Sequence, residues 1–547
     1  MPRYQLGLGL FVFALVALVT AAPVLVVITG AFIDNVWHET FVASAANRSA
    51  IGYSFLLALR APIAAFIGFL IAWLLIRIRI PGGRVIEFAM WMSFFIPLLP
   101  VTLSWILLLN PRYGLVNQVL KSVIGVAPFD IYSVGGILWV HIVASSVPVM
   151  VVLLGPAIRQ LDASFEEVAR VCGSGPMAVF RRIALPILAP VILTGTLAGF
   201  IKSLEAFEVE QLLGRPSNIY VYSTRIYDLA SWEPPKFADA MALSTFVLFV
   251  LLIIAIAYQR LNRRYNYATI LGRGANFRQL EIGWSRWLIS AVLFLVVAIS
   301  LFCPLIMLVC GSFMKLFGFF HIPSPYTLDH WREVLTDPIF SDALKNSLLL
   351  SGGAGLGGVL IYAIVAYLIV RSPLPGRGIV DLLAWLPWSI PGILLGVSVL
   401  WLILASQALS FLYGSLTSLV LIMIVAQMPI GVHMMKTSIG QIAIELEQSS
   451  RICGAGAART FCSIVLPLIR PMLVSIFVLV FISALRDIST IIFLASAKSQ
   501  TLSLLMMQFA TSSNLEAAAV IGVITTAIVI LVALVTRRFG LQVSVQR

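Results

Sequence analysis

The chain has 547 residues, of which 60% are hydrophobic and 11% charged, with a formal net charge of +13. Its mean hydropathy is +1.03. This composition excludes an ordinary soluble domain, because apolar runs of roughly 20 residues, enough to cross a hydrocarbon core, recur along the whole length. The chain is therefore expected to be an integral membrane protein.

A membrane-spanning segment must satisfy its own backbone hydrogen bonds, so each apolar run is predicted to be a helix. The expected fold class is all-α, with about twelve spans. The first run is too long for the apolar part of a cleaved signal peptide, although cleavage is a minor alternative. In chain order the spans are expected at 6–33, 51–76, 85–109, 135–155, 187–207, 240–260, 287–312, 346–370, 379–405, 411–436, 468–495 and 514–536.

The positive charge lies mainly on one side of this arrangement. If the N-terminus is cytoplasmic, the cytoplasmic segments carry a net charge of +15 and the remainder −2, which gives the total of +13. This is the positive-inside bias of membrane proteins. It predicts that both termini lie in the cytoplasm, and it argues against a nucleic-acid partner. The Arg-rich join at 261–286 is expected to contact anionic lipid headgroups.

One polar segment occurs twice, at 166–190 and 447–471, and ten of its 25 aligned positions are identical. Further matches lie at an offset of 294, where Arg77, Pro81, Gly82, Trp91 and Pro97 correspond to Arg371, Pro375, Gly376, Trp385 and Pro391. The chain is therefore predicted to be a tandem duplication, with a first module at 1–272 and a second at 273–547. Six spans in each module give the two halves a parallel topology.

The repeated segment is predicted to form a short helical elbow at the cytoplasmic surface. We name 160–186 the first elbow and 441–467 the second elbow. In the first, Gly173 ends one helix by tolerating positive φ, and Pro176 suits the first turn of the next. Pro186 then ends that helix or starts the following span. Two equivalent polar elbows in an apolar chain suggest two docking points for a partner in the aqueous phase.

The elbow resembles the "EAA" loop of binding-protein-dependent ABC importer permeases, whose members have the type I importer fold. The resemblance rests on the spacing of Glu167, Ala169, Gly173, Ile183, Leu185 and Pro186, while Gln448 and two serines replace Glu-Ala-Ala in the second copy. It implies that these loops dock into the grooves of two copies of a cytoplasmic ATPase. The residues expected to couple to the ATPase are Glu166, Glu167, Ala169, Gly173, Ile183, Leu185, Pro186, Glu447, Gln448, Gly454, Ile464, Leu466 and Pro467.

The resemblance also implies a periplasmic or lipid-anchored solute-binding protein and a place in the bacterial inner membrane. None of the seven Lys residues follows a Gly, so the chain lacks a Walker-type phosphate cradle. It is expected to be no enzyme and to hold no cofactor, with ATP and Mg bound by the partner ATPase. No histidine or cysteine spacing indicates a structural metal.

The outer ends of the fifth and eleventh spans are similar to ferric-iron-type permeases, around 203–214, 222–227 and 485–489. Lipid-facing charges at the midplane would cost roughly 2.5–3.5 kcal/mol each. The charged residues here are therefore expected to line the substrate pathway, and the alternative is that they are solvated charges at helix ends near the outer surface. Glu205 and Arg486 occupy equivalent positions and are hypothesised to meet across the pseudo-twofold axis as an outer gate. The pathway residues are Lys202, Glu205, Glu208, Glu210, Arg486 and Asp487.

Other functions stay open at this point. Polyamine, thiamine and phosphonate permeases are close relatives of the ferric type, so the transported solute is not settled by the resemblance. A secondary transporter can also have twelve spans in two parallel halves, but it usually buries coupling acids near the midplane. A receptor or scaffold would explain neither the duplication nor the paired elbows.

Overall fold

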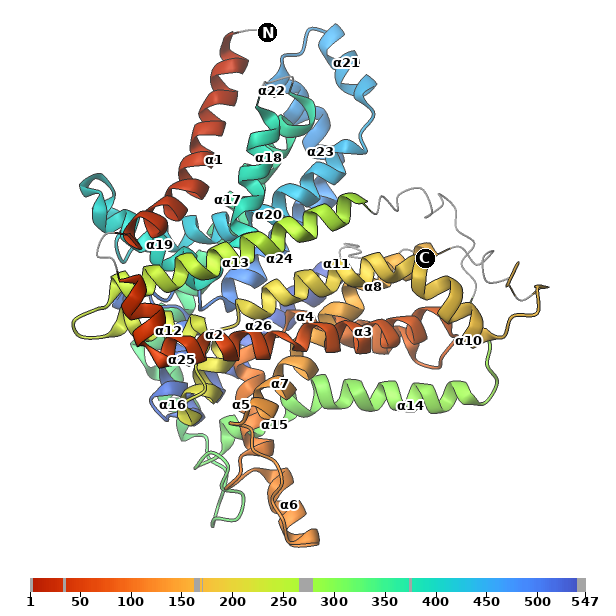
Figure 1. Cartoon of the computed structure of the whole chain (residues 1–547), viewed down its shortest axis with the longest axis vertical. Coiled ribbons are helices and arrows are strands. Elements are labelled where there is room, and N and C mark those ends of the chain that lie inside the picture. The colour runs from red at the N-terminus through yellow and green to blue at the C-terminus, as the bar shows by residue number, and fades with distance from the viewer. Residues whose placement is uncertain are drawn as a thin grey trace.

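The computed structural model describes residues 3–32, 36–161, 168–169, 171–264, 279–372 and 376–538. Its elements are helices throughout the described ranges, apart from two isolated β-bridges (Figure 1). The all-α membrane fold expected from the apolar runs is confirmed.

Eight segments are long and apolar enough to cross a membrane as helices, and three bent helix pairs bring the number to as many as 11. Helix α1 (Arg3–Gly30) covers the remaining run expected from the sequence. The eight segments are α2–α3 (Ala45–Ala58, Arg60–Arg77), α7–η2–α8 (Val134–His141, Ile142–Ser146, Val147–Gln160), η3–α11 (Phe180–Ala184, Leu185–Leu204), α13 (Phe237–Arg264), α14–η7–α15 (Ser285–Val297, Ala298–Phe302, Cys303–Phe313), α17 (Pro338–Arg371), α20 (Leu416–Gly440) and α26 (Leu515–Arg538).

The span expected at 85–109 is broken by a sharp bend. It is a pair of helices, α4 (Gly83–Phe95) and α5 (Leu98–Leu109), bent by 105°. Pro97 lies in the break with φ −60° and ψ 138°. Proline has no backbone N–H and disfavours helical conformation in the residue before it, so the helix stops and restarts here.

The span expected at 379–405 is broken in the same way. Helix α18 (Arg377–Trp385), extended by the 3-10 turn η8 (Leu386–Ser389), meets α19 (Gly392–Ala405) at 110°. Pro391 lies in this break with φ −55° and ψ 143°. The two halves therefore share a bent pair, placed by equivalent prolines.

The expected span at 468–495 is shorter than predicted. Helix α24 (Arg470–Arg486) meets the preceding helical segment at 77° and ends at Arg486. Beyond it, Asp487 accepts hydrogen bonds from the backbone N–H (2.9 Å) and the hydroxyl (3.0 Å) of Thr490. Such a local side-chain turn competes with helix continuation.

The internal duplication also appears in the contacts. In each half an arginine at the end of a long helix donates a hydrogen bond to a carbonyl oxygen near the start of the elbow. In each half a serine hydroxyl also accepts a hydrogen bond from the first backbone N–H of a short helix, α12 (Tyr222–Ser231) or α25 (Leu502–Thr511). The matched pairs are Arg77–Leu161 and Arg371–Ile442 (both 2.5 Å), and Ser54–Tyr222 (2.8 Å) and Ser347–Leu502 (2.7 Å). Their repetition supports the expected two-module organisation.

The two halves are interlocked. Helix α1 of the first half packs against α18 and α19, whereas α14 and α15 of the second half pack against α4 and α5. The start of the second half, from residue 279 on, is bound to the first half, since Leu280 pairs with the backbone of Arg77 and Arg79 at 2.7 and 3.0 Å. Figure 1 shows the two elbow regions far apart, with α10 (Pro176–Val179) at the right edge and α21 (Ile444–Ile452) at the top.

Candidate functional site: two elbows and a charged cavity

The first elbow is described from Val168 onward, except for Arg170, so Glu166 and Glu167 lie outside the described residues. Gly173 has φ +81°. Helices α10 and η3 follow, and Pro186 lies in the first turn of α11, where its missing N–H costs nothing. Ala169 is buried, Ile183 and Leu185 are half-buried, and Pro186 is exposed.

The second elbow repeats this geometry. Helix α21 is followed by Gly454 with φ +83°, then by α22 (Ala457–Thr460), η10 (Phe461–Val465) and α23 (Leu466–Leu468). A Cβ atom added at Gly173 or Gly454 would meet nothing within 4 Å. The glycines are therefore needed for the left-handed backbone rather than for space. Gln448 and Pro467 are exposed, and Ile464 and Leu466 are half-buried.

Glu447 differs from its expected place at a docking surface. It is 2% exposed and faces the protein interior. Its Oε1 lies 2.8 Å from Nε of Arg371, and its Oε2 accepts a hydrogen bond of 2.9 Å from the hydroxyl of Tyr367. Glu447 thus anchors the second elbow from inside.

Two docking candidates escaped the sequence reasoning. Val171 and Ile452 are 88% and 87% exposed, the highest values among the large hydrophobic residues of the described chain. They occupy equivalent positions at the offset of 281, one residue before each Cys-Gly pair. An apolar residue repeated in a polar loop was the signal, since exposed apolar groups that recur mark interaction sites.

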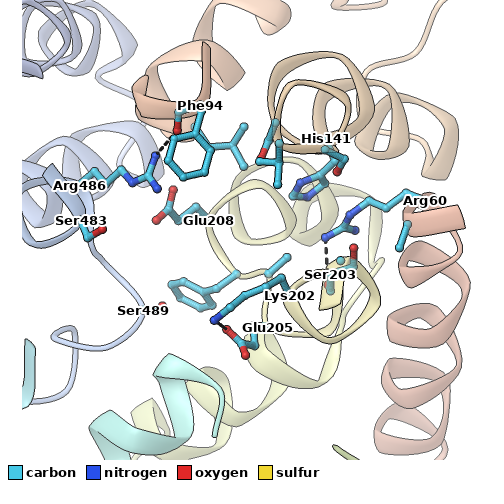
Figure 2. Close-up of a pocket in the computed structure, with 18 of the residues that line it drawn as sticks. Arg60, Phe94, His141, Lys202, Ser203, Glu205, Glu208, Ser483, Arg486 and Ser489 are labelled. Carbon is cyan, nitrogen blue, oxygen red and sulfur yellow. Dashed lines mark hydrogen bonds and ion pairs between the residues drawn. The ribbon is translucent and has the colours of Figure 1, made fainter. Parts of the chain in front are cut away.

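The charged residues near the ends of α11 and α24 line a cavity of about 350 Å³. Figure 2 shows it between elements of both halves. Five of the six expected pathway residues lie in its wall, together with Ser93 and Phe94 of the first bent pair. These five are Lys202, Glu205, Glu208, Arg486 and Asp487.

The hypothesised pairing of Glu205 with Arg486 is not the arrangement in this structure. Oε2 of Glu205 lies 2.7 Å from Nζ of Lys202, three residues earlier on the same helix turn. Arg486 instead donates from Nη1 to the carbonyl oxygens of Phe94 (2.9 Å) and Phe95 (3.5 Å) at the end of α4 (Figure 2). The Pro97 break leaves these carbonyls without helical donors, so a cation is well placed there.

Glu210 does not line the cavity. It is 1% exposed and lies behind the wall, with its Oε1 2.8 Å from Nε2 of His141 and 3.5 Å from Nη1 of Arg60. Nη2 of Arg60 donates to the carbonyl oxygen of Ser203 at 2.9 Å. His141 and Arg60 do reach the cavity. Arg60 was missed, although a lone charge within an apolar run signals a buried partner.

Within the described residues, no three His, Cys, Asp or Glu side chains come together as a metal site.

Comparison with known proteins agrees with this geometry. The family model "Binding-protein-dependent transport system inner membrane component" matches residues 64–267 and 358–544, one stretch in each half. Each stretch includes one elbow. The family match thus covers most of the chain and follows its duplication.

Several curated proteins are similar to this chain. A putative ferric transport system permease of Haemophilus influenzae is 26% identical over 71% of the chain, and a ferric transport system permease of Actinobacillus pleuropneumoniae is also 26% identical over 71%. The chain spans only 61% and 56% of these two relatives. A trehalose transport system permease of Mycobacterium tuberculosis is 30% identical over 40% of the chain and 80% of its own length.

Proposed function

This chain belongs to the binding-protein-dependent transport system inner membrane components, and we propose that it is the permease of an ATP-driven importer of ferric iron. In this proposal a periplasmic or lipid-anchored binding protein delivers the solute from outside. Two copies of a cytoplasmic ATPase, which bind ATP and Mg, drive its passage. Both chain termini lie in the cytoplasm.

The observation that carries the proposal is the matched pair of elbows. Each has a left-handed glycine, and the two most exposed large apolar residues of the described chain, Val171 and Ile452, lie at equivalent positions in the two elbows. Equivalent surfaces on one chain suit two copies of the same partner. Because the chain has no Walker-type Lys, the energy of ATP must come from that partner.

Ferric iron is proposed as the solute for two reasons. Two similar proteins are described as ferric permeases, and the cavity wall carries the carboxylates of Glu205, Glu208 and Asp487. Oxygen ligands suit a hard cation. The similarity to a trehalose permease keeps other small solutes, including polyamines, thiamine and phosphonates, as the alternatives to be tested.

The test is uptake into proteoliposomes. The chain is reconstituted with its partner ATPase, with ATP inside, and the partner binding protein is added outside, loaded with radioactive iron. We expect iron accumulation that requires both ATP and the binding protein. Uptake without ATP would indicate a secondary carrier, and ATP-driven uptake of another solute in preference to iron would reassign the substrate.

A further inference from the structure

The buried contact between Arg371 and Glu447 joins three elements of the second half. Arg371 is the last residue of α17, and its Nη2 donates to the carbonyl oxygens of Ile439 (3.0 Å) and Ile442 (2.5 Å) at the end of α20. Its Nε lies 2.8 Å from Oε1 of Glu447 on α21. The two groups form an ion pair, but their angles do not meet the geometry of a hydrogen bond. One guanidinium therefore links α17, α20 and the second elbow.

Tyr367 strengthens the same junction. One helical turn before Arg371, its hydroxyl donates to Oε2 of Glu447 at 2.9 Å, and its ring lies 4.9 Å from that of Phe461 on η10. Both arms of the second elbow are thus held by α17. They are also tied to each other, since the hydroxyls of Ser450 and Thr460 lie 3.0 Å apart.

Burial indicates that this junction is specific. The side chains of Arg371 and Glu447 are 12% and 3% exposed, whereas the neighbouring Gln448 is exposed. Removing one partner of a buried ion pair leaves an uncompensated charge in a poorly solvated place. The elbow therefore resists rotation away from α17.

Helix α17 connects this junction to the cavity through α24. It packs closely against α24, where a Cβ atom on Gly355 would come within 2.8 Å of the ring of Phe477. Helix α24 ends at Arg486, which lines the cavity, and α20 contributes Gln427 to the same wall. Every step from elbow to cavity is a packed helix or a buried polar contact.

We propose that Arg371, Tyr367 and Glu447 form the joint that transmits movement of the second elbow to α17 and, through α24, to the cavity. In this inference, which rests on the proposed function, Glu447 is a positioning residue that acts through Arg371 and does not itself dock the ATPase. Gln448 and Ile452 remain on the outer face for docking.

The test separates transport from ATP hydrolysis. Glu447→Gln keeps the side-chain shape and removes the charge, while Tyr367→Phe keeps the ring contact and removes the hydroxyl. The control is Arg79→Gln, because Arg79 and Glu281 form a pair of the same length, 2.8 Å, with side chains 69% and 64% exposed. Each protein is assembled with the ATPase and binding protein, and iron uptake, ATP hydrolysis and ATPase affinity are measured.

We expect uptake per ATP hydrolysed to fall at least about tenfold in Glu447→Gln, within the usual range of coupling energies, and less in Tyr367→Phe. ATPase affinity and hydrolysis should stay within about twofold of wild type, and the control should match wild type in every assay. Unchanged coupling in both variants would overturn the joint. So would loss of ATPase affinity in Tyr367→Phe, because the contact would then only shape the docking surface.

The wild-type protein tells the two proposals apart. If it shows no ATP-dependent uptake of any solute, the proposed function fails and the joint fails with it. If it transports with normal coupling and both variants do the same, only the joint is wrong.

Discussion

Arg486 donates a hydrogen bond of 2.9 Å to the carbonyl oxygen of Phe94, 392 residues earlier in the chain, and its Cζ lies 5.8 Å from the Phe94 ring. The opposite half has a counterpart: Nζ of Lys202 lies 4.7 Å from the ring of Trp388. Phe94 and Trp388 are equivalent at the offset of 294. In each half, a cation near the end of α11 or α24 thus contacts the aromatic residue that lies three positions before the proline of the bent helix pair in the other half.

Glu205 holds the contact between Lys202 and Trp388 in place, because it forms an ion pair with Lys202. We predict that Glu205→Arg will strongly reduce uptake, because it replaces an ion pair with like charges three residues apart. Adding Lys202→Glu should restore part of the uptake, and adding Arg486→Glu should not. Rescue by Arg486→Glu instead would favour direct pairing of Glu205 with Arg486 during transport. Uptake is measured in proteoliposomes at equal protein abundance.

The buried triad of Arg60, His141 and Glu210 is predicted to contribute to stability in the first half. Glu210→Ile alone should destabilise the protein by about 3–5 kcal/mol, because it leaves the buried Arg60 charge without an opposite charge beside it. Thermal unfolding in detergent measures the effect. The offsets of 294 and 281 between the halves place small or apolar residues at the corresponding positions of the second half, namely Ala354, Ile422 and Ile491.

Those counterparts supply the control for the triad. Changing Arg60, His141 and Glu210 together to Ala, Ile and Ile should be less destabilising than Glu210→Ile alone, since an apolar set can replace a buried charged one at little cost. A triple variant that unfolds earlier than the single variant would show that the charges contribute something the apolar set cannot replace.

The elbow glycines are predicted to be sensitive to β-branched residues. Gly173→Val and Gly454→Val should each reduce uptake at normal protein abundance, because the left-handed backbone costs a side chain roughly 1–2 kcal/mol while the space around it is open. We expect the change at Gly173 to be more damaging, since its elbow keeps more of the family pattern.

The matched control for the glycines is Gly456→Ala. Gly456 has φ −69° and ψ 165°, which any residue can adopt, and nothing lies within 4 Å of an added Cβ. The Gly456→Ala variant should transport like wild type. Gly173→Asn should retain more uptake than Gly173→Val, because Asn adopts positive φ more readily than Val. Wild-type uptake in both valine variants would contradict the elbow's role.

Val171 and Ile452 are predicted to be anchors for the ATPase. Changing either to Asp should lower ATPase affinity about 10- to 100-fold, the equivalent of losing one buried aliphatic side chain. Val123→Asp on α6 (Leu115–Ile124) is the control, because Val123 is also highly exposed, at 74%, but far from both elbows in the chain. Binding of purified ATPase to the detergent-solubilised chain gives the affinities. Equal affinities for all three variants would exclude this docking surface.

The features that the sequence predicts correctly are those set by neighbouring residues in the chain. The apolar runs predict the spans, and the repeated glycines predict the left-handed turns of both elbows. Pro97 and Pro391 were visible as a matched pair, yet the bends of 105° and 110° were not foreseen. Their angle depends on what the helices pack against on either side of the break.

The charged cavity was harder to predict than the elbows. The spacing of Lys202 and Glu205 placed them on one side of a helix. In the structure Glu205 pairs with Lys202, its neighbour in the chain, rather than with the distant Arg486. Arg486 binds carbonyl oxygens that are freed only because α4 ends at the Pro97 break. A partner created by a bend in the other half cannot be read from side-chain spacing alone.

The central claim, that one chain carries two ATPase docking sites, is tested most directly by native mass spectrometry of the assembled, uptake-competent complex. We predict one copy of this chain with two copies of the ATPase. Changing Val171 and Ile452 to Asp together should leave the chain without either ATPase. An active complex that requires two copies of this chain would contradict the claim.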